Sequence, residues 1–542
     1  MKKVLIFMLF FISIFSILMG SVAYYRIVVN GSITGSTGNA VFVVRDTVDG
    51  ESWSNKVIDL GKINPGDSGS FDVIMDVTGS SVDMYATLEI IKNDLPTNLK
   101  FYTTKDHKSE LHKYYSFLDK NGVNKELVTI YWYWNPSIND DEDNRFINKS
   151  FSATISLTAI QISDYATMKN GYSVLNGGSE FWNNNYRPYI RTITFGNDLS
   201  NLPSSCNEDN LCWNLSENEN QNKKVYGYLI DSGLKDATDN TKSLYNLYIV
   251  SDAPIFAPSN SSYLFFNFNN LIGVKFNNFN TSNVTDMQRM FYSCTELKSL
   301  DLSSFNTAKV TNMEGMFGFD ESLVDLDISN FNTANVTLIN SMFTSCYSLV
   351  SIDLSSFNTA NVTNMMFLFN DCLSLTSLDV TSFDTTNVTN MQSMFNDLVL
   401  ITSLDVSKFN TAKVTNMSKM FCDCKKLVDL DVSKFDTKNV TNISMMFSNC
   451  NLLTDLNLNG FNSSNIIYWT SAFENCYKLS STINVMNLDI SDENNYLNAF
   501  RNTATDSNAR VVVNYLSSVS SSIDTLIATK SSNSNVVKGI KL

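Results

Sequence analysis

The sequence predicts a multidomain protein in which an antiparallel β-sandwich is followed by an α/β solenoid of short repeats with a cap at each end. Two observations carry this prediction: apolar and polar side chains alternate in several runs before residue 165, and a 26-residue period begins near residue 259. The predicted organisation is a leader (1–23), the sandwich (24–165), a mixed connector and N-terminal cap (166–258), the repeats (259–506) and a C-terminal cap (507–542).

The composition narrows the function. The chain has 542 residues, with 39 Lys and Arg against 54 Asp and Glu, so its formal net charge is −15. A charge of this sign argues against nucleic acid and anionic membrane surfaces as partners. Two histidines, His107 and His112, leave little room for sites built on that residue. We therefore expect a binding or structural protein and not an enzyme, with no cofactor.

Residues 1–23 have the features of a secretory signal. Lys2 and Lys3 precede an apolar run that ends at Met19, and small residues, Ser21 and Ala23, stand before the expected cleavage point. If this segment stayed uncleaved, it would serve as an N-terminal membrane anchor. The sequence thus predicts a protein that is secreted or held at the cell surface.

Alternating side chains predict strands in residues 24–165. Val128, Ile130, Trp132 and Trp134 share one face of a strand, and similar runs precede and follow them. The aromatic strand could be a carbohydrate platform, but packing of one face in the core is favoured. An acidic loop at 140–143 could hold Ca²⁺, yet it lacks the glycine and distal glutamate of an EF-hand loop, so a solvated turn is favoured.

The connector carries the first two cysteines. Cys206 and Cys212 bracket a short polar loop, and in an exported chain such a pair predicts a disulfide. The bond would staple a loop, and no redox function follows from it.

The repeat is the strongest signal in the chain. Two phenylalanines recur every 26 residues, one series running from Phe279 to Phe461 and the other from Phe291 to Phe473. Units of constant length predict a stacked solenoid, because one unit cannot bury its apolar face alone.

Each unit contains two apolar clusters. Leu297, Leu300 and Leu302 form the L-x-x-L-x-L pattern of a leucine-rich repeat, whose last part is a short strand. Met313 and Phe317 lie four residues apart, with Met316 between them, which predicts a helical turn on the side opposite the strand.

Aspartates recur at one position of the predicted strand. They are Asp301, Asp327, Asp353, Asp379, Asp405 and Asp431. Each lies between two inward apolar residues, so we expect all six to project from the open face of the sheet. This acidic row could receive a basic protein segment or Ca²⁺, and the alternative is a solvated surface inherited with the repeat.

Cysteines also share one position of the repeat. They are Cys294, Cys346, Cys372, Cys424, Cys450 and Cys476, and Asp320 and Leu398 take the same position in two further units. A row of buried, reduced thiols is favoured over disulfides between stacked neighbours. Thiols in a line do not form the tetrahedral cluster that zinc requires, so no metal site is expected.

The repeat unit, written M-F-x-x-C-x-x-L-x-x-L-D-L-S-x-F-N-T-x-N-V-T-N-M, resembles that of the BspA-like leucine-rich repeat surface proteins of bacteria. The resemblance covers residues 259–506 and implies an exported bacterial surface protein that adheres to proteins of the host matrix or of other cells. It transfers no binding residues to this chain.

The leading prediction is therefore an adhesin that binds proteins through its repeats. The alternative is a structural or matrix protein that assembles through the sandwich. An extracellular enzyme with paired carboxylates is disfavoured, because a flat row of aspartates has no cleft in which the pKa of one carboxyl could be raised by burial.

Overall fold

The computed structural model describes residues 24–33, 36–45, 51–62, 65–76, 83–91, 95–96, 99–102, 111, 113–118, 125–135, 150–162, 166–170, 180–218, 220–458 and 461–542. The chain forms two compact units, Met1–Tyr165 and Ala166–Leu542. The predicted leader, both histidines and the acidic loop at 140–143 lie outside the described residues. Within those residues, no helix is long and apolar enough to cross a membrane.

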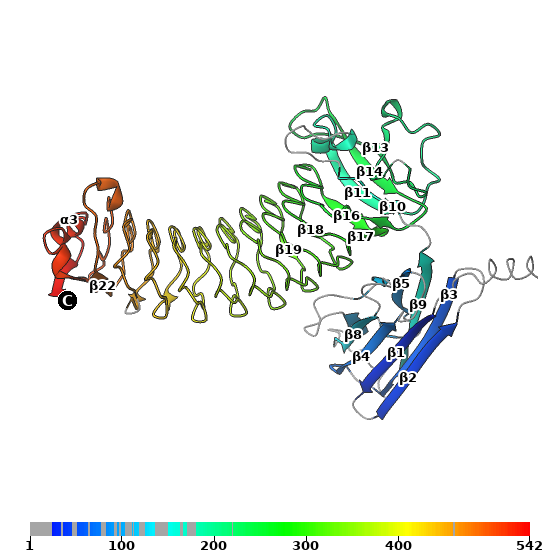
Figure 1. The fold of residues 1–542 in the computed structure, drawn as a ribbon, viewed down its shortest axis with the longest axis horizontal. Helices are drawn as coiled ribbons and strands as arrows, with labels where there is room; N and C mark the ends of the chain where they lie inside the picture. The colour runs from blue at the N-terminus through cyan, green and yellow to red at the C-terminus, as the bar shows by residue number, and fades with distance from the viewer. Residues whose placement is uncertain are drawn as a thin grey trace, which may run out of the picture. The chain divides into compact units, whose positions relative to one another are not determined.

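The N-terminal unit consists of two antiparallel sheets (Figure 1). One has the strand order β2-β1-β4-β8-β6 and the other has the order β3-β9-β5-β7. The strands are β1 (Tyr24–Ile33), β2 (Ser36–Arg45), β3 (Glu51–Lys62), β4 (Ser68–Asp76), β5 (Asp83–Ile91), β6 (Leu99–Tyr102), β7 (Lys113–Leu118), β8 (Lys125–Trp134) and β9 (Ser150–Ile162).

The aromatic strand β8 supplies the core of this unit. Trp132 and Trp134 are buried, whereas Tyr131 and Tyr133 on the opposite face are half-buried. The ring of Trp134 meets that of Phe151 on β9 edge to face, with centroids 5.5 Å apart, so the two sheets share a core. Because both tryptophans are enclosed, they do not form an exposed carbohydrate platform.

The second unit opens with a five-stranded sheet of order β12-β13-β14-β11-β16. Its strand β11 pairs in parallel with both β14 and β16, which brings the connector alongside the first repeat. The elements before the repeats are β10 (Ala166–Thr167), η1 (Glu180–Trp182), η2 (Arg187–Tyr189), β11 (Ile190–Gly196), η3 (Glu208–Asn210), β12 (Cys212–Asn214), β13 (Tyr226–Lys235), β14 (Ser243–Val250), β15 (Ile255–Phe256), β16 (Gly273–Phe276) and β17 (Phe279–Asn280).

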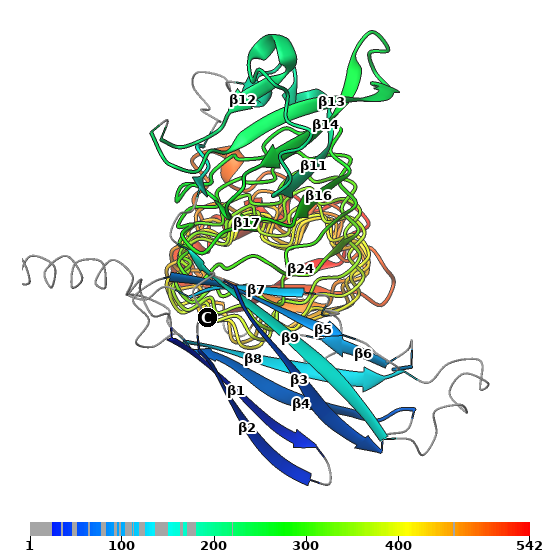
Figure 2. The same cartoon turned by 90° about the vertical axis from the view of Figure 1, so that its right-hand side faces the viewer.

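The 26-residue units stack in register (Figures 1 and 2). Parallel bridges join equivalent residues of successive units, as between Asn364 and Asn390 and between Asn390 and Asn416. From Phe291 to Phe473, buried phenylalanine rings of neighbouring units stack with centroids 5.6–6.1 Å apart. A continuous apolar core therefore runs through all the units.

The predicted α/β leucine-rich-repeat solenoid is wrong. Within the described residues the one α-helix is α3 (Ile523–Ile527), which lies after the repeats. The repeats consist mainly of turns and loops, and the strands assigned between β17 and β22 have two residues each. These strands are β18 (Ser299–Leu300), β19 (Asp325–Leu326), β20 (Asp429–Leu430) and β21 (Asp455–Leu456).

Backbone hydrogen bonding explains why the helical turn does not form. Left-handed residues stand four apart in this part of the unit, as at Ser341 (φ 58°) and Ser345 (φ 58°), and a right-handed helix cannot contain them. Alternate amides also donate to the next unit: the N–H of Phe317 donates to the carbonyl of Met342 at 3.0 Å. The apolar spacing of Met313 and Phe317 therefore reflects burial in the core and not a helical face.

This ladder between units has a direction, and its two ends are capped in opposite ways. At its start, carbonyl oxygens need donors: the indole N–H of Trp182 donates to Leu264 at 2.7 Å, and the Asn170 amide donates to Ser262 at 3.1 Å. At its end, amides need acceptors: the N–H of Phe500 donates to the Thr529 hydroxyl at 3.0 Å. The connector and the C-terminal cap thus complete the hydrogen bonding of the repeats.

A parallel sheet of order β22-β23-β24 joins the end of the repeats, which supplies β22, to the C-terminal cap, which supplies β23 and β24. The elements of this region are β22 (Ser481–Val485), η4 (Glu493–Asn495), β23 (Val511–Tyr515), η5 (Ser517–Val519), α3 and β24 (Val536–Lys541). The side chains of Ile523 and Leu526 on α3 are buried against the end of the core.

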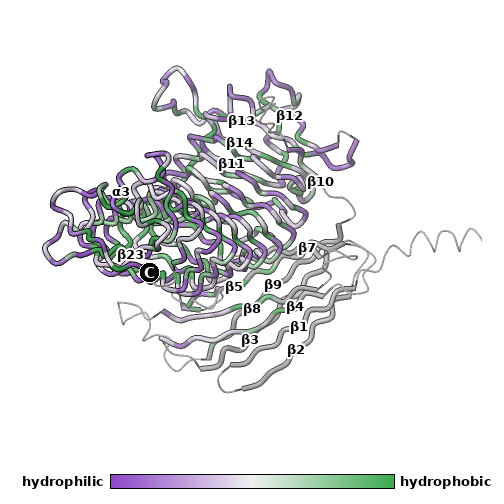
Figure 3. The backbone as a smooth tube through the Cα atoms, turned by 60° about the vertical axis from the view of Figure 1, so that its left-hand side comes forward, coloured by the Kyte–Doolittle hydropathy of each residue, from purple (hydrophilic) through white to green (hydrophobic). Residues whose placement is uncertain are grey.

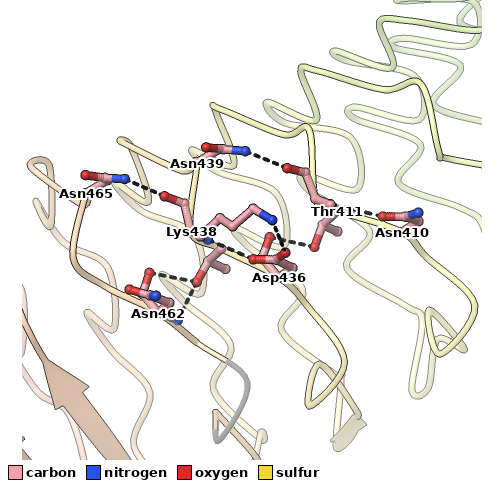
Figure 4. A network of polar contacts seen from close by, with 9 residues as sticks. Asn410, Thr411, Asp436, Lys438, Asn439, Asn462 and Asn465 are labelled. Atoms are coloured by element: carbon pink, nitrogen blue, oxygen red, sulfur yellow. Dashed lines mark hydrogen bonds and ion pairs between the residues drawn. The ribbon is translucent and has the colours of Figure 1, made fainter.

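Side-chain hydrogen bonds also join neighbouring units at the N-T-x-N segment of the repeat (Figure 4). The hydroxyl of Thr411 donates to the carbonyl of Asp436 at 3.0 Å, and the amide of Asn439 donates to the carbonyl of Ala412 at 2.7 Å. These bonds recur between other units, as from Thr385 to Asn410. The N-T-x-N part of the repeat is thus explained by bonds that fix the distance between units.

Candidate functional site

Three of the six row aspartates, Asp301, Asp327 and Asp431, lie just after a two-residue strand, and the other three lie at the same position of units in which no strand is assigned. Their flanking residues are buried, as Leu300 and Leu302 are around Asp301, while the aspartates themselves are exposed or half-buried. Along the coils, hydrophobic and hydrophilic residues interchange at short intervals (Figure 3). The row therefore lies on the surface, although the extended sheet that was predicted to carry it is absent from the described repeats.

Each row aspartate closes a small turn. Oδ1 of Asp301 accepts the N–H of Ser303 at 3.0 Å and its hydroxyl at 2.6 Å. The backbone bond to the residue two positions later recurs in every member. Each aspartate therefore has a structural role in its unit, because its side-chain oxygen accepts the hydrogen bond of a backbone N–H in the turn.

Hydrogen bonds keep three of these carboxylates ionised. The pKa values of Asp379, Asp405 and Asp431 are lowered first by the side-chain hydroxyl and then by the backbone N–H two residues later. Lys408 and Lys434 lower the pKa of Asp405 further by their charge. These three aspartates are therefore fixed negative charges near neutral pH.

A row of exposed residues runs beside the aspartates, three positions earlier in each unit: Lys298, Val324, Val350, Thr376, Thr402 and Val428. Val324, Val350 and Val428 expose 46%, 43% and 36% of their surfaces. The N–H of Thr376 donates to the carbonyl of Val350 at 3.3 Å, and that of Val428 donates to Thr402 at 2.9 Å, so the row is continuous from unit to unit. We call the two rows together the Val–Asp face.

A disulfide joins Cys206 and Cys212. The loop between them contains η3, and Cys212 packs with Tyr228 and Val250 in a small apolar cluster of its own. The disulfide thus fixes a loop on the five-stranded sheet and lies apart from the repeats in the sequence.

The repeat cysteines are free, buried thiols. The Cys346 thiol donates to the carbonyl of Phe317 at 3.1 Å, and the other members of the column do the same to the equivalent carbonyl. Burial raises the pKa of Cys424 and of Cys476 to about 12. Because the thiolate is the reactive form, these side chains are unreactive core residues.

The repeats contain a second carboxylate row that the sequence analysis above does not identify. Asp371, Asp397 and Asp423 also recur every 26 residues, and the pKa of Asp397 is raised to about 6 by burial and by the charges of Asp423 and Asp371. The 26-residue spacing was the signal that could have identified them. Within the described residues, no group of three or more His, Cys, Asp or Glu side chains could hold a metal ion.

A family model described as "Mycoplasma protein of unknown function, DUF285" matches residues 259–376, 319–403 and 399–511. The assignment of the repeats to the BspA-like leucine-rich repeat family is therefore wrong, and so is the leucine-rich repeat label. No curated protein and no solved structure matches the chain. The repeats of this chain are thus similar to those of a family for which no function is described.

Proposed function

We propose that this chain is an exported adhesin that binds basic segments of proteins, in the host matrix or on other cells, through the Val–Asp face. The observation that supports the proposal is the parallel course of the two rows. The exposed valines Val324, Val350 and Val428 give a partner apolar surface to bury, and the charged row beside them selects partners by the sign of their charge.

The spacing of the face supports an extended or helical partner segment over a small ligand. Backbone hydrogen bonds hold equivalent residues of neighbouring units together, so charges recur at a short and constant interval. A partner with lysines or arginines at regular intervals could meet several aspartates at once. The net charge of −15 would also speed its approach at low salt.

The experiment compares two variants that each replace six aspartates with asparagine in the full chain. The first changes Asp301, Asp327, Asp353, Asp379, Asp405 and Asp431. The second, the matched control, changes Asp198, Asp231, Asp239, Asp489, Asp492 and Asp506, whose Oδ1 atoms also accept the N–H two residues later. Asparagine keeps this acceptor, so both variants change charge by the same amount without removing turns.

Binding to immobilised matrix proteins and to a lysine-rich peptide would be measured at low and physiological salt, with and without Ca²⁺. We expect saturable binding that the first variant reduces at least tenfold and the control leaves within about twofold. Equal losses in both variants would indicate a response to net charge alone. Undiminished binding by the first variant would place the partner site elsewhere.

Export is part of the proposal and rests on the sequence of residues 1–23. Expression of the full chain in bacteria, followed by protease treatment of intact cells and analysis of the medium, would test it. Protein found entirely inside the cells would contradict this part of the proposal.

A further inference from the structure

Asp320 is a completely buried carboxyl in the middle of the repeats. It takes the place of cysteine in the thiol column, between Cys294 and Cys346, and its exposed fraction is 0%. Its Oδ1 accepts the backbone N–H of Cys294 at 2.8 Å, while its Oδ2 is buried without a hydrogen-bond partner. A charged carboxylate with a buried, unpartnered oxygen costs free energy of folding, which favours the protonated form of this side chain.

The neighbouring units show what this position requires. Each thiol of the column donates to a carbonyl oxygen 29 residues earlier: Cys294 to Phe265 at 3.2 Å and Cys346 to Phe317 at 3.1 Å. At the end of the array, the hydroxyl of Thr503 donates to Phe473 at 2.6 Å in the same way. A donor therefore meets this carbonyl wherever the position holds cysteine or threonine, whereas Leu398 fills it without donating. In the unit of Asp320 the equivalent carbonyl is that of Phe291.

We propose that Asp320 is carried as a neutral acid whose Oδ2–H donates to the carbonyl of Phe291, and that loss of this proton loosens the stack at this unit. The thiols of the column also accept the backbone N–H of the preceding unit, as Cys372 does from Cys346. A protonated carboxyl reproduces both bonds, since Oδ1 accepts and Oδ2–H donates. A carboxylate can only accept, and it would face a carbonyl oxygen in the core. Asp320 thus makes the contact between units pH-sensitive at this one position of the cysteine column.

The electrostatics agree with this geometry. Burial raises the pKa of Asp320 well above its usual range, and the N–H of Cys294 opposes the rise. The titratable groups that face it are the thiols of Cys294 and Cys346, both of which are buried and neutral near pH 7. Within the described residues, no salt bridge pairs with Asp320 to stabilise its charge.

The direction of the pH effect follows from linkage. A carboxyl whose pKa is higher in the folded than in the unfolded chain binds more protons when folded, so stability falls as pH rises above the unfolded value near 4. Below that value the contribution is fully present. Between the two pKa values, the equilibrium for opening this unit should change by about tenfold per pH unit.

The test uses the full chain with two variants, Asp320→Asn and Asp320→Cys. Asparagine resembles the neutral acid in shape and offers both an acceptor and a donor, and cysteine is the residue of six other units. Hydrogen exchange of peptides covering 291–323 would be compared among the three proteins at each pH from 5 to 8. Peptides covering 372–398 serve as an internal control, and comparison at equal pH removes the intrinsic pH dependence of exchange.

We expect the wild type to exchange progressively faster than both variants at 291–323 as pH rises, by about tenfold per unit, and the control region to exchange equally in all three. A constant ratio between wild type and Asp320→Asn across this range would overturn the proposal. So would a pH-dependent ratio of the same size at 372–398. If one variant fails to fold, the other still decides between these results.

Discussion

Replacing Thr529 with valine should open the C-terminal end of the repeats. The Thr529 hydroxyl accepts the N–H of Phe500 at 3.0 Å, and Phe500 is completely buried at the end of the phenylalanine stack. Valine has nearly the same shape but no acceptor, so the packing remains while one buried amide loses its partner. An unsatisfied buried donor costs about 1–3 kcal/mol.

The structure indicates where that cost will appear. In neighbouring units the equivalent amides are satisfied by the next unit, as Phe473 is by Ala499, so the loss is confined to the cap. At about 2 kcal/mol, amides of residues 495–505 should exchange with solvent roughly 30-fold faster. The assay is hydrogen exchange with mass spectrometry, with Thr525→Val in the preceding helix α3 as the control, since Thr525 is half-buried and does not cap Phe500.

Two results would refute this reasoning. Unchanged exchange near Phe500 in Thr529→Val would mean that the hydroxyl does not serve as the cap. Equal acceleration in the Thr525→Val control would mean that helix propensity or packing, and not the lost acceptor, governs the stability of this end.

Two further predictions concern the interior and the second acidic row. Phe369→Ala should destabilise the chain by about 3–5 kcal/mol, because the ring is buried and stacks on Phe343 at 5.6 Å and Phe395 at 6.1 Å; thermal unfolding would measure this, and a loss below 1 kcal/mol would argue against a continuous stack. Since the pKa of Asp397 is raised to about 6, the wild type should gain stability as pH falls from above 6 toward 4. The full shift corresponds to about 3 kcal/mol, and solvent screening of this half-buried group reduces it to roughly 1 kcal/mol. Asp397→Asn should remove this gain, as judged by hydrogen exchange of residues 391–400 at each pH, and an unchanged pH dependence would contradict it.

The apolar positions of the repeats could be read from the sequence, but their conformation could not. Met313, Met316 and Phe317 are all buried, as the 26-residue period implies. Their spacing also fits one face of a helix, and periodicity alone does not distinguish the two arrangements. The left-handed residues Gly315 and Phe319 decide between them, and a phenylalanine in that conformation cannot be anticipated from its type.

The candidate site, too, could be predicted from the sequence only in part. The six aspartates and their regular spacing are visible in the sequence, as is their surface position beside buried leucines. The valine row beside them was overlooked, because lysine or threonine takes the same position in three of the six units and the exposure of the valines depends on how the units stack. The turn-closing role of each aspartate also required the structure, since it depends on the backbone path after the short strand.

By itself, the sequence determined the length of the repeat unit, the residues that fill its core and the sign of its charge. These properties follow from the residue types that recur at a constant period, and they hold whatever the local backbone conformation is. Only the tertiary structure decided that the units are turns joined by hydrogen bonds to the next unit, that Trp182 and Thr529 cap opposite ends, and that Asp320 lies among thiols without a partner for Oδ2. The physical reason is that each of these features depends on where a backbone N–H or C=O finds its partner, and those partners lie about one repeat or more away in the chain.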